Sequence, residues 1–195
     1  MRRRTPLHTL RLLSILVRNM GLSFASSRLS VSELTGSLTS CKHTSLLERI
    51  PKILTPPVVE NLPPYFHGID SKELAEIWLD RMLSESRLFL VTSVEGTLIG
   101  FLFASVENDT DAHIGYLLAE DYWGKGLASE LLTGFIGEIS NNESWVKLIA
   151  GVEESNVASA NLLKRQGFIE QPNSGDGVVF FEYTISTPRT ENTDG

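Results

Sequence analysis

The sequence predicts a mixed α/β (α+β) domain, in which antiparallel strands come first and strands then alternate with helices. Two strand-like runs, Leu88–Ser93 and Leu98–Val106, are separated by the turn residues Glu95-Gly96-Thr97 and predict a hairpin. From Gly126 onward the hydrophobic period becomes that of a helix, and a strand, a further helix and a closing strand follow. A chain of 195 residues is long enough for one such domain with a sizeable core.

The individual elements are predicted from hydrophobic periodicity and turn residues. In chain order they are a strand over 28–34, a weak helix over 45–54 that Pro51 interrupts, a helix over 71–85, strands over 88–93, 98–106 and 112–118, a helix from 126, a strand over 145–152, a helix over 156–166 and a strand over 178–185. The helix over 71–85 starts with a capping-box sequence, Asp70-Ser71-Lys72-Glu73. Gly167 follows the helix over 156–166, as expected of a left-handed residue after a helix end.

The composition is that of a globular protein, with 42% hydrophobic and 21% charged residues. Its net charge of -7 is unevenly spread, because residues 1–32 contain arginines and no acidic residue. The remaining body is therefore strongly acidic, which disfavours general nucleic-acid binding and favours a cationic or amine substrate. The single cysteine, Cys41, makes no internal disulfide, so a reducing interior is the expected setting.

Residues 1–26 are expected to form a basic N-terminal extension, before a single folded domain over 27–186 and a polar tail over 187–195. The arginine-rich, acid-free start with the apolar run Leu12–Val17 is typical of an organelle-targeting segment. A disordered start is the equal alternative. The apolar run is far shorter than the ~20 residues of a membrane span, so no transmembrane helix is expected. We therefore expect a cytoplasmic protein, or a mitochondrial one if the extension acts in targeting.

A glycine-rich segment lies between the predicted strand His113–Leu118 and the helix that follows. It reads Trp123-Gly124-Lys125-Gly126-Leu127-Ala128. Small residues let successive N–H groups point inward at a helix N-terminus, an arrangement that suits a pyrophosphate; glycine content alone is explained equally by a tight turn. The spacing fits neither the P-loop nor the dinucleotide fingerprint. No metal site is predicted, because the histidines are scattered and the turn 109–113 lacks the glycine of a calcium loop.

Residues 123–128 and a second segment, Asn156–Phe168, together carry a family resemblance. The first resembles the phosphate loop Gln/Arg-x-x-Gly-x-Gly/Ala of the GNAT acetyltransferase superfamily, except that Trp123 replaces the usual polar first residue. The second is similar to the N-x-x-S and G-F segment of the ribosomal-protein N-terminal (RimJ/RimL-like) branch. The resemblance extends over about 28–186. It implies a central, mostly antiparallel sheet with a splayed strand pair, flanked by helices.

The resemblance implies an enzyme that transfers acetyl from acetyl-CoA to a primary amine by direct attack. The acceptor is a small molecule or a protein N-terminus, and the enzyme is a monomer or homodimer. The candidate residues for binding acetyl-CoA are Leu117, Leu118, Trp123, Gly124, Lys125, Gly126, Leu127, Ala128 and Asn156. For Asn156 the alternative is a helix cap. The backbone near Leu117 is implied to hold the carbonyl oxygen of the acyl group as it gains charge.

Three side chains are candidates for catalysis. Ser159 is the implied substitute for the tyrosine that many members use to protonate the leaving thiol, because Leu163 occupies that tyrosine's position. His113 lies where relatives often carry a glutamate, and histidine titrates near neutrality, as a general base requires. Glu153 is a rival base; it and Glu154 point to opposite faces if the strand continues, so only one reaches the cleft. Each of these side chains has an ordinary structural role as its alternative.

Two other hypotheses about function compete with the enzyme hypothesis. Leu163, together with the absence of a glutamate at position 113, motivates a non-catalytic acyl-CoA-binding module. A structural protein that only borrows the fold is the third hypothesis. The segment Pro64-Tyr65-Phe66-His67-Gly68 is a candidate for the acceptor groove or for the core. The sequence does not identify the amine.

Overall fold

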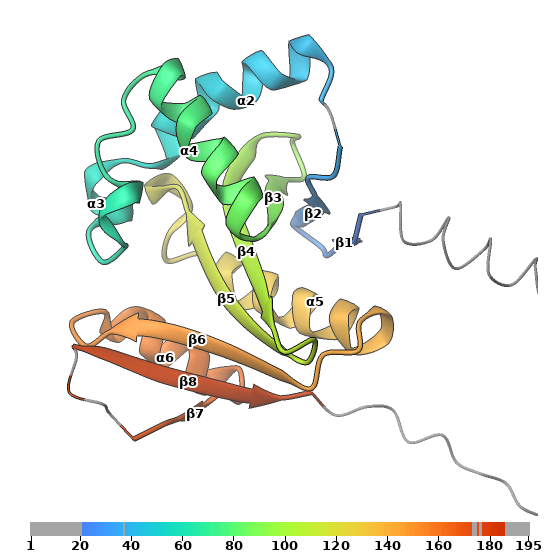
Figure 1. Ribbon diagram of the computed structural model, residues 1–195, viewed down its shortest axis with the longest axis vertical. Helices are drawn as coiled ribbons and strands as arrows, with labels where there is room; N and C mark the ends of the chain where they lie inside the picture. Colours follow the sequence, from blue (N-terminus) through green and yellow to red (C-terminus); the bar gives the residue numbers. More distant parts are fainter. Residues whose placement is uncertain (1–20, 37, 173–174, 176, 186–195) are drawn as a thin grey trace, which may run out of the picture.

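The computed structural model describes residues 21–36, 38–172, 175 and 177–185 (Figure 1). Predictions about residues 1–20 and 187–195 lie outside these ranges. The strands are β1 (Ser23–Ala25), β2 (Leu29–Glu33), β3 (Arg87–Ser93), β4 (Leu98–Glu107), β5 (Asp111–Leu118), β6 (Lys147–Glu153), β7 (Ile169–Glu170) and β8 (Val178–Thr184). The helices are α2 (Ser40–Ile53), α3 (Pro56–Val59), α4 (Lys72–Glu85), α5 (Leu127–Asn142) and α6 (Val157–Arg165), with the 3-10 turns η1 (Pro64–Phe66) and η2 (Glu120–Tyr122).

The strands form one sheet in the order β1-β2-β3-β4-β5-β6-β8-β7. Each neighbouring pair is antiparallel except β5 and β6, which run parallel. The parallel pair follows from the α5 crossover, since a parallel partner cannot be reached by a tight turn. The predicted mixed α/β class with a mostly antiparallel sheet is confirmed.

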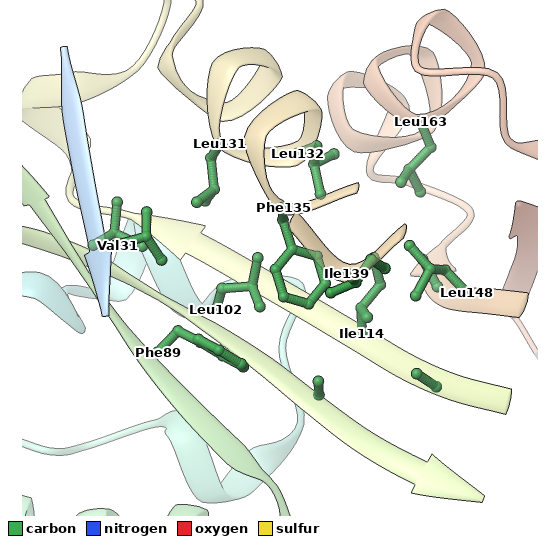
Figure 2. Close-up of a cluster of buried hydrophobic side chains, with 14 of the residues drawn as sticks. Val31, Phe89, Leu102, Ile114, Leu131, Leu132, Phe135, Ile139, Leu148 and Leu163 are labelled. Carbon is green, nitrogen blue, oxygen red and sulfur yellow. The ribbon is translucent and has the colours of Figure 1, made fainter. Parts of the chain in front are cut away.

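Helices cover both faces of the sheet, so the chain has two hydrophobic cores. On one face α5 and α6 pack against the strands; Figure 2 shows Phe135 and Ile139 of α5 pointing toward Leu102 and Ile114 of the sheet. Leu163 of α6 belongs to the same core and is fully buried. On the other face α2, α3 and α4 cover Leu88, Phe101 and Leu117. Alternation along each strand sends successive side chains to these two cores.

The parallel contact between β5 and β6 is short. Its partners are Asp111 with Lys147, Ala112 with Leu148, and His113 with Ile149. Beyond His113 the two strands separate, and Figure 1 shows them meeting near one end and diverging toward the other. The sheet therefore contains the splayed pair that the family resemblance implied. We call the opening between β5 and β6, beyond His113 and Ile149, the splay.

The structure differs from the sequence predictions at several element ends. Helix α2 continues through Pro51 to Ile53, because its apolar face, including Ile50 and Ile53, is buried against α4 and outweighs one missing N–H donor. Helix α4 is capped by the Ser71 hydroxyl, which accepts from the Leu74 N–H at 3.2 Å, and not by Asp70. The sheet begins at β1, inside the predicted extension, and β7 was not predicted.

Candidate functional site

The glycine-rich loop, residues 123–128, forms a turn at the start of α5 that we call the cradle, because its shape would suit an anion. Gly124 and Gly126 have φ values of 68° and 75°, a left-handed conformation that favours glycine. The backbone N–H groups of residues 124–129 make no hydrogen bond to an acceptor in the described part of the chain, and the first N–H engaged is that of Glu130, with the Gly126 carbonyl. Free N–H groups at a helix N-terminus are suited to a phosphate.

Trp123 ties this cradle to the end of β5. Its indole Nε1 donates to the carbonyl oxygen of Leu118 at 2.7 Å, while its backbone N–H donates to the Glu120 carbonyl at 3.0 Å. The backbone N–H of Trp123 is therefore already engaged, unlike those of residues 124–129. Nearly half of the Trp123 side chain is exposed beside the loop, and its fixed position holds the end of the strand and the cradle together.

The turn between β1 and β2 clamps the cradle from the other side. Arg28 donates from Nη1 to the Lys125 carbonyl oxygen at 2.8 Å and from Nε to Glu130 at 2.6 Å. The Ser26 hydroxyl donates to the second oxygen of the Glu130 carboxylate at 2.6 Å. Sequence reasoning missed this clamp because Arg28 and Glu130 lie 102 residues apart and neither belongs to a local motif.

The clamp shifts the titration of Glu130. The hydrogen bond from the Ser26 hydroxyl, with further hydrogen bonds from Arg28 and Ser27, outweighs the opposing effect of burial and lowers the Glu130 pKa to about 2. The carboxylate is therefore charged under all ordinary conditions, and it keeps Arg28 directed at the loop.

A second set of contacts fixes the start of α5 from α6. Gln166 donates from Nε2 to the Ser129 hydroxyl at 2.6 Å and accepts from the Thr133 hydroxyl at 2.9 Å. The cradle thus lies between two independent supports, one from the β1–β2 turn and one from the end of α6.

Beyond His113, the side of β5 that faces the splay has backbone groups without a partner strand. The N–H of Ala119 donates to Ile99 of β4, and hydrogen-bonded residues alternate along an antiparallel strand. The Leu117 backbone consequently faces β4, whereas the backbones of Tyr116 and Leu118 face the splay. The indole of Trp123 already occupies the Leu118 carbonyl, which leaves the Leu118 N–H as the donor nearest the cradle along the strand.

The second sequence segment forms the start of α6. The Asn156 side-chain oxygen accepts from the Ser159 N–H at 3.1 Å and caps the helix, leaving the amide nitrogen of that side chain for another partner. The Ser159 side chain is half-buried and lies beside the Tyr116 phenol. Leu163, to which the family resemblance assigned the position of the usual thiol-acid tyrosine, is buried in the core.

His113 and Glu153 share the face opposite α5 and α6. His113 pairs with Ile149, and Glu153 lies four residues farther along β6, so alternation puts these side chains on one face, roughly 13 Å apart along the strand. The His113 imidazole lies 3.1 Å from the Glu107 carboxylate and is 44% exposed. The sequence candidates therefore divide, with His113 and Glu153 on one side of the splay and Ser159 on the other.

Two hollows lie away from the splay, on the side of α2 and α4. One, of about 710 Å³, is lined by α2, α3 and residues 67–72, including His67 and Gly68 of the predicted aromatic segment. The other, of about 440 Å³, lies between α4 and residues 34–44. Phe66 is buried in the core, as the alternative interpretation of that segment held.

Within the described ranges there is no group of three or more histidine, cysteine or acidic residues that could hold a metal ion. In the same part of the chain no helix is long and apolar enough to cross a bilayer.

Comparison with known proteins identifies the family. The family model described as "Acetyltransferase (GNAT) domain" matches residues 50–169. A structure of RimL, the ribosomal L7/L12 α-N-protein acetyltransferase in complex with coenzyme A, superposes with a TM-score of 0.68 at 15% identity, covering 86% of this chain and 99% of that chain. A search of curated protein sequences found no match.

Two further structures share the fold. The ribosomal-protein-S5-alanine acetyltransferase from Vibrio fischeri has a TM-score of 0.61 and 16% identity, covering 85% of this chain and 97% of that chain. A variant of the SpeG spermidine N-acetyltransferase from Vibrio cholerae has a TM-score of 0.61 and 18% identity, covering 83% of this chain and 96% of that chain.

The family model, found on a chain with this fold, shows the class of protein: an acyl-CoA-dependent N-acyltransferase. With the family model matching more than half of its length, the chain belongs to the GNAT acetyltransferase family. The predicted membership of the GNAT superfamily is confirmed. The fold of the chain is shared with the two acetyltransferases named for ribosomal proteins.

The clamp predicts an acid-sensitive contribution to stability. A carboxylate with a lowered pKa stabilises the fold fully above its ordinary value of 4.5 and loses that effect as the pH falls toward 2. Glu130→Gln should therefore lower the free energy of unfolding at pH 7, and its difference from wild type should shrink in acid. Urea unfolding at several pH values measures this. Glu138→Gln, on the same helix, is the control; an equal loss in both variants, or one that does not depend on pH, contradicts the role of the clamp.

Proposed function

We propose that the protein transfers an acetyl group from acetyl-CoA to a primary amine, which attacks the acetyl carbon directly. The observation that carries the proposal is the row of N–H groups at residues 124–129 that have no acceptor in the described part of the chain, set beside the open edge of β5. Together they fit an anionic ligand whose chain runs from a helix N-terminus into the splay. Acetyl-CoA has a pyrophosphate that would bind at the N-terminus of α5 and an acetyl thioester that would lie in the splay.

The cradle residues would hold the donor. The N–H groups of Gly124, Lys125, Gly126, Leu127 and Ala128 would bind the pyrophosphate, with the Lys125 ammonium and the exposed Trp123 side chain beside it. Asn156 would donate from its amide nitrogen, because its oxygen already caps α6. The Leu118 N–H would stabilise the negative charge that develops on the acetyl oxygen. Leu118 is proposed instead of Leu117 because the Leu117 backbone faces β4.

The acceptor would approach from the face that carries His113 and Glu153. Position 151 is glycine, and a Cβ there would lie 3.2 Å from the Phe180 ring of β8, so the ring covers β6 at this point. Phe180 is 42% exposed, and Ile149 is its apolar neighbour along β6. An apolar floor bordered by the Glu153 carboxylate suits an amine attached to an apolar group.

One hydrogen bond marks the edge of this acceptor region. The Ser155 hydroxyl donates to the Asn61 side-chain oxygen at 3.0 Å, which joins the β6–α6 turn to the segment between α3 and η1.

The acceptor itself is a small-molecule amine or a protein N-terminus. The structural neighbours named for ribosomal proteins and for spermidine represent these two classes. The unpaired Cys41 supports a reducing compartment such as the cytoplasm.

The direct test is acetyl transfer by the purified chain. Acetyl-CoA is mixed with peptides bearing different N-terminal residues and with small amines including spermidine, and free thiol and acetylated product are followed together. We expect thiol release that depends on the acceptor. Saturable binding of acetyl-CoA without acetylation of any acceptor would favour the alternative, a non-catalytic acyl-CoA-binding module. Absence of binding would favour a protein that only shares the fold.

A substitution separates the two candidate bases. In the proposed reaction His113 accepts a proton from the attacking amine through bridging water molecules, since Leu118 lies five residues farther along β5, and Glu107 orients its ring. His113→Ala should then lower turnover by roughly 10²-fold near neutral pH and leave CoA affinity unchanged. The readout is kcat from about pH 6 to about pH 8, where imidazoles titrate. His43→Ala on α2 is the control. An unchanged profile would remove His113 from this role and leave Glu153 as the base.

A further inference from the structure

Tyr116 carries a hydroxyl group that packing does not explain. The residue lies on β5 beyond the last contact with β6, and its ring packs into the core beneath α5 and α6. The phenol oxygen is buried and makes no hydrogen bond of good geometry in the described part of the chain, although the Ser159 side chain lies close enough to act on it. A phenylalanine would fill the same space without burying an unpaired polar atom, which costs stability. The hydroxyl therefore calls for a functional explanation.

The surroundings of this phenol favour a hydrogen-bond donor. Burial raises the pKa of Tyr116 to about 12, against the smaller lowering effects of a hydrogen bond from the Ser159 hydroxyl and of the positive charge of Arg165. The phenol thus keeps its proton at any physiological pH. A coenzyme thiol, like the cysteine thiol with an ordinary pKa of ~8.5, is the stronger acid, so the phenol donates a hydrogen bond and transfers no proton.

The side chain beside the phenol is the serine of the second sequence signature. Ser159 is half-buried at the start of α6, and its backbone is fixed by the Asn156 cap. Its hydroxyl lies close enough to the Tyr116 phenol to affect the pKa of that phenol, and Leu163, one turn later, offers no polar group. Catalytic hydrogen bonds are often longer without substrate and tighten when it binds. A small rotation of the Ser159 hydroxyl would bring it onto the phenol.

We propose that Tyr116 is a positioning residue that donates a hydrogen bond to the Ser159 oxygen, so that the Ser159 hydrogen is directed at the sulfur of the acyl donor. This pair would replace the tyrosine missing at position 163, and the inference rests on the proposed acetyl transfer. A hydroxyl that accepts one hydrogen bond becomes a better donor in the next, so the two groups act as a chain.

Neither the Ser159 hydroxyl nor the Tyr116 phenol gives up a proton in the acetyl transfer. The amine nitrogen forms a bond to the acetyl carbon and loses a proton to the base, and the carbon–sulfur bond breaks with its electron pair going to sulfur. The sulfur leaves as a thiolate that the Ser159 hydroxyl stabilises, with the Tyr116 phenol behind it. The base then returns its proton to water.

Kinetics of single and double variants test the coupling. Ser159→Ala should lower kcat about tenfold, and Tyr116→Phe about fivefold, with the KM for acetyl-CoA nearly unchanged, as expected for single hydrogen bonds. In the Ser159→Ala background, Tyr116→Phe should have no further effect, because its partner is already lost. Multiplying effects would overturn the coupling, and so would an unchanged kcat in Tyr116→Phe. Tyr183→Phe on β8 makes the same chemical change elsewhere and is the control.

Thermal unfolding separates this role from a structural one. Tyr116→Phe removes a buried, unpaired hydroxyl and keeps the ring, so its melting temperature should equal or exceed that of wild type while kcat falls. A lowered melting temperature with a parallel loss of CoA affinity would assign the phenol a structural role and overturn the proposal.

Binding of free CoA provides a readout that needs no amine acceptor. Calorimetric titrations with CoA and with desulfo-CoA, at pH values below and above the thiol pKa of ~8.5, report stabilisation of the thiolate. The preference for CoA over desulfo-CoA should grow with pH in wild type, disappear in Ser159→Ala and weaken in Tyr116→Phe. Such a result without acetylation of any amine would uphold this inference and reject the proposed function. A preference that is the same in all three proteins would reject the inference whatever the activity.

Discussion

The parallel contact between β5 and β6 extends over three residue pairs, and the arrangement of the site depends on where it stops. If the pairing continued past His113, the Tyr116 and Leu118 backbones would be hydrogen-bonded to β6 and the sheet would be closed. Because it stops, one strand keeps free backbone groups in the middle of a sheet, where such groups are almost always paired. A ligand that lies along β5 would satisfy them. The opening and the proposed binding site are therefore one feature.

The open sheet is stabilised by contacts from distant parts of the sequence. Trp123 fixes the end of β5 to the cradle, Arg28 and Glu130 fix the cradle to the β1–β2 turn, and Gln166 fixes the start of α5 to α6. None of these contacts closes the splay. Each instead holds one of its borders, so that the anion cradle and the free strand edge keep a constant relation. Such support is what preorganised binding of a long, flexible donor requires.

The sequence predicted the fold and the cradle well because both are local patterns. Alternation and helical periodicity located nearly all long elements, and the glycine-rich segment forms the predicted turn into a helix, with Gly124 and Gly126 in the left-handed conformation. Features that depend on distance in the fold were not predictable. The Arg28 clamp joins segments 102 residues apart, and the orphan phenol of Tyr116 is visible only when α6 is placed over β5. Pro51 lies inside α2, although the sequence predicted that it interrupts the helix, because burial of the apolar face of the helix outweighs the local effect of proline.

The central claim, that one acyl-CoA molecule occupies both the cradle and the splay, is tested most directly by amide hydrogen exchange with and without CoA. Binding should slow exchange at two separate places, the amides of residues 124–129 and those of Tyr116 and Leu118, which have no acceptor from β6 in the free protein. Protection confined to the 710 Å³ hollow between α2 and α3, with no change at the cradle and β5, would contradict the account.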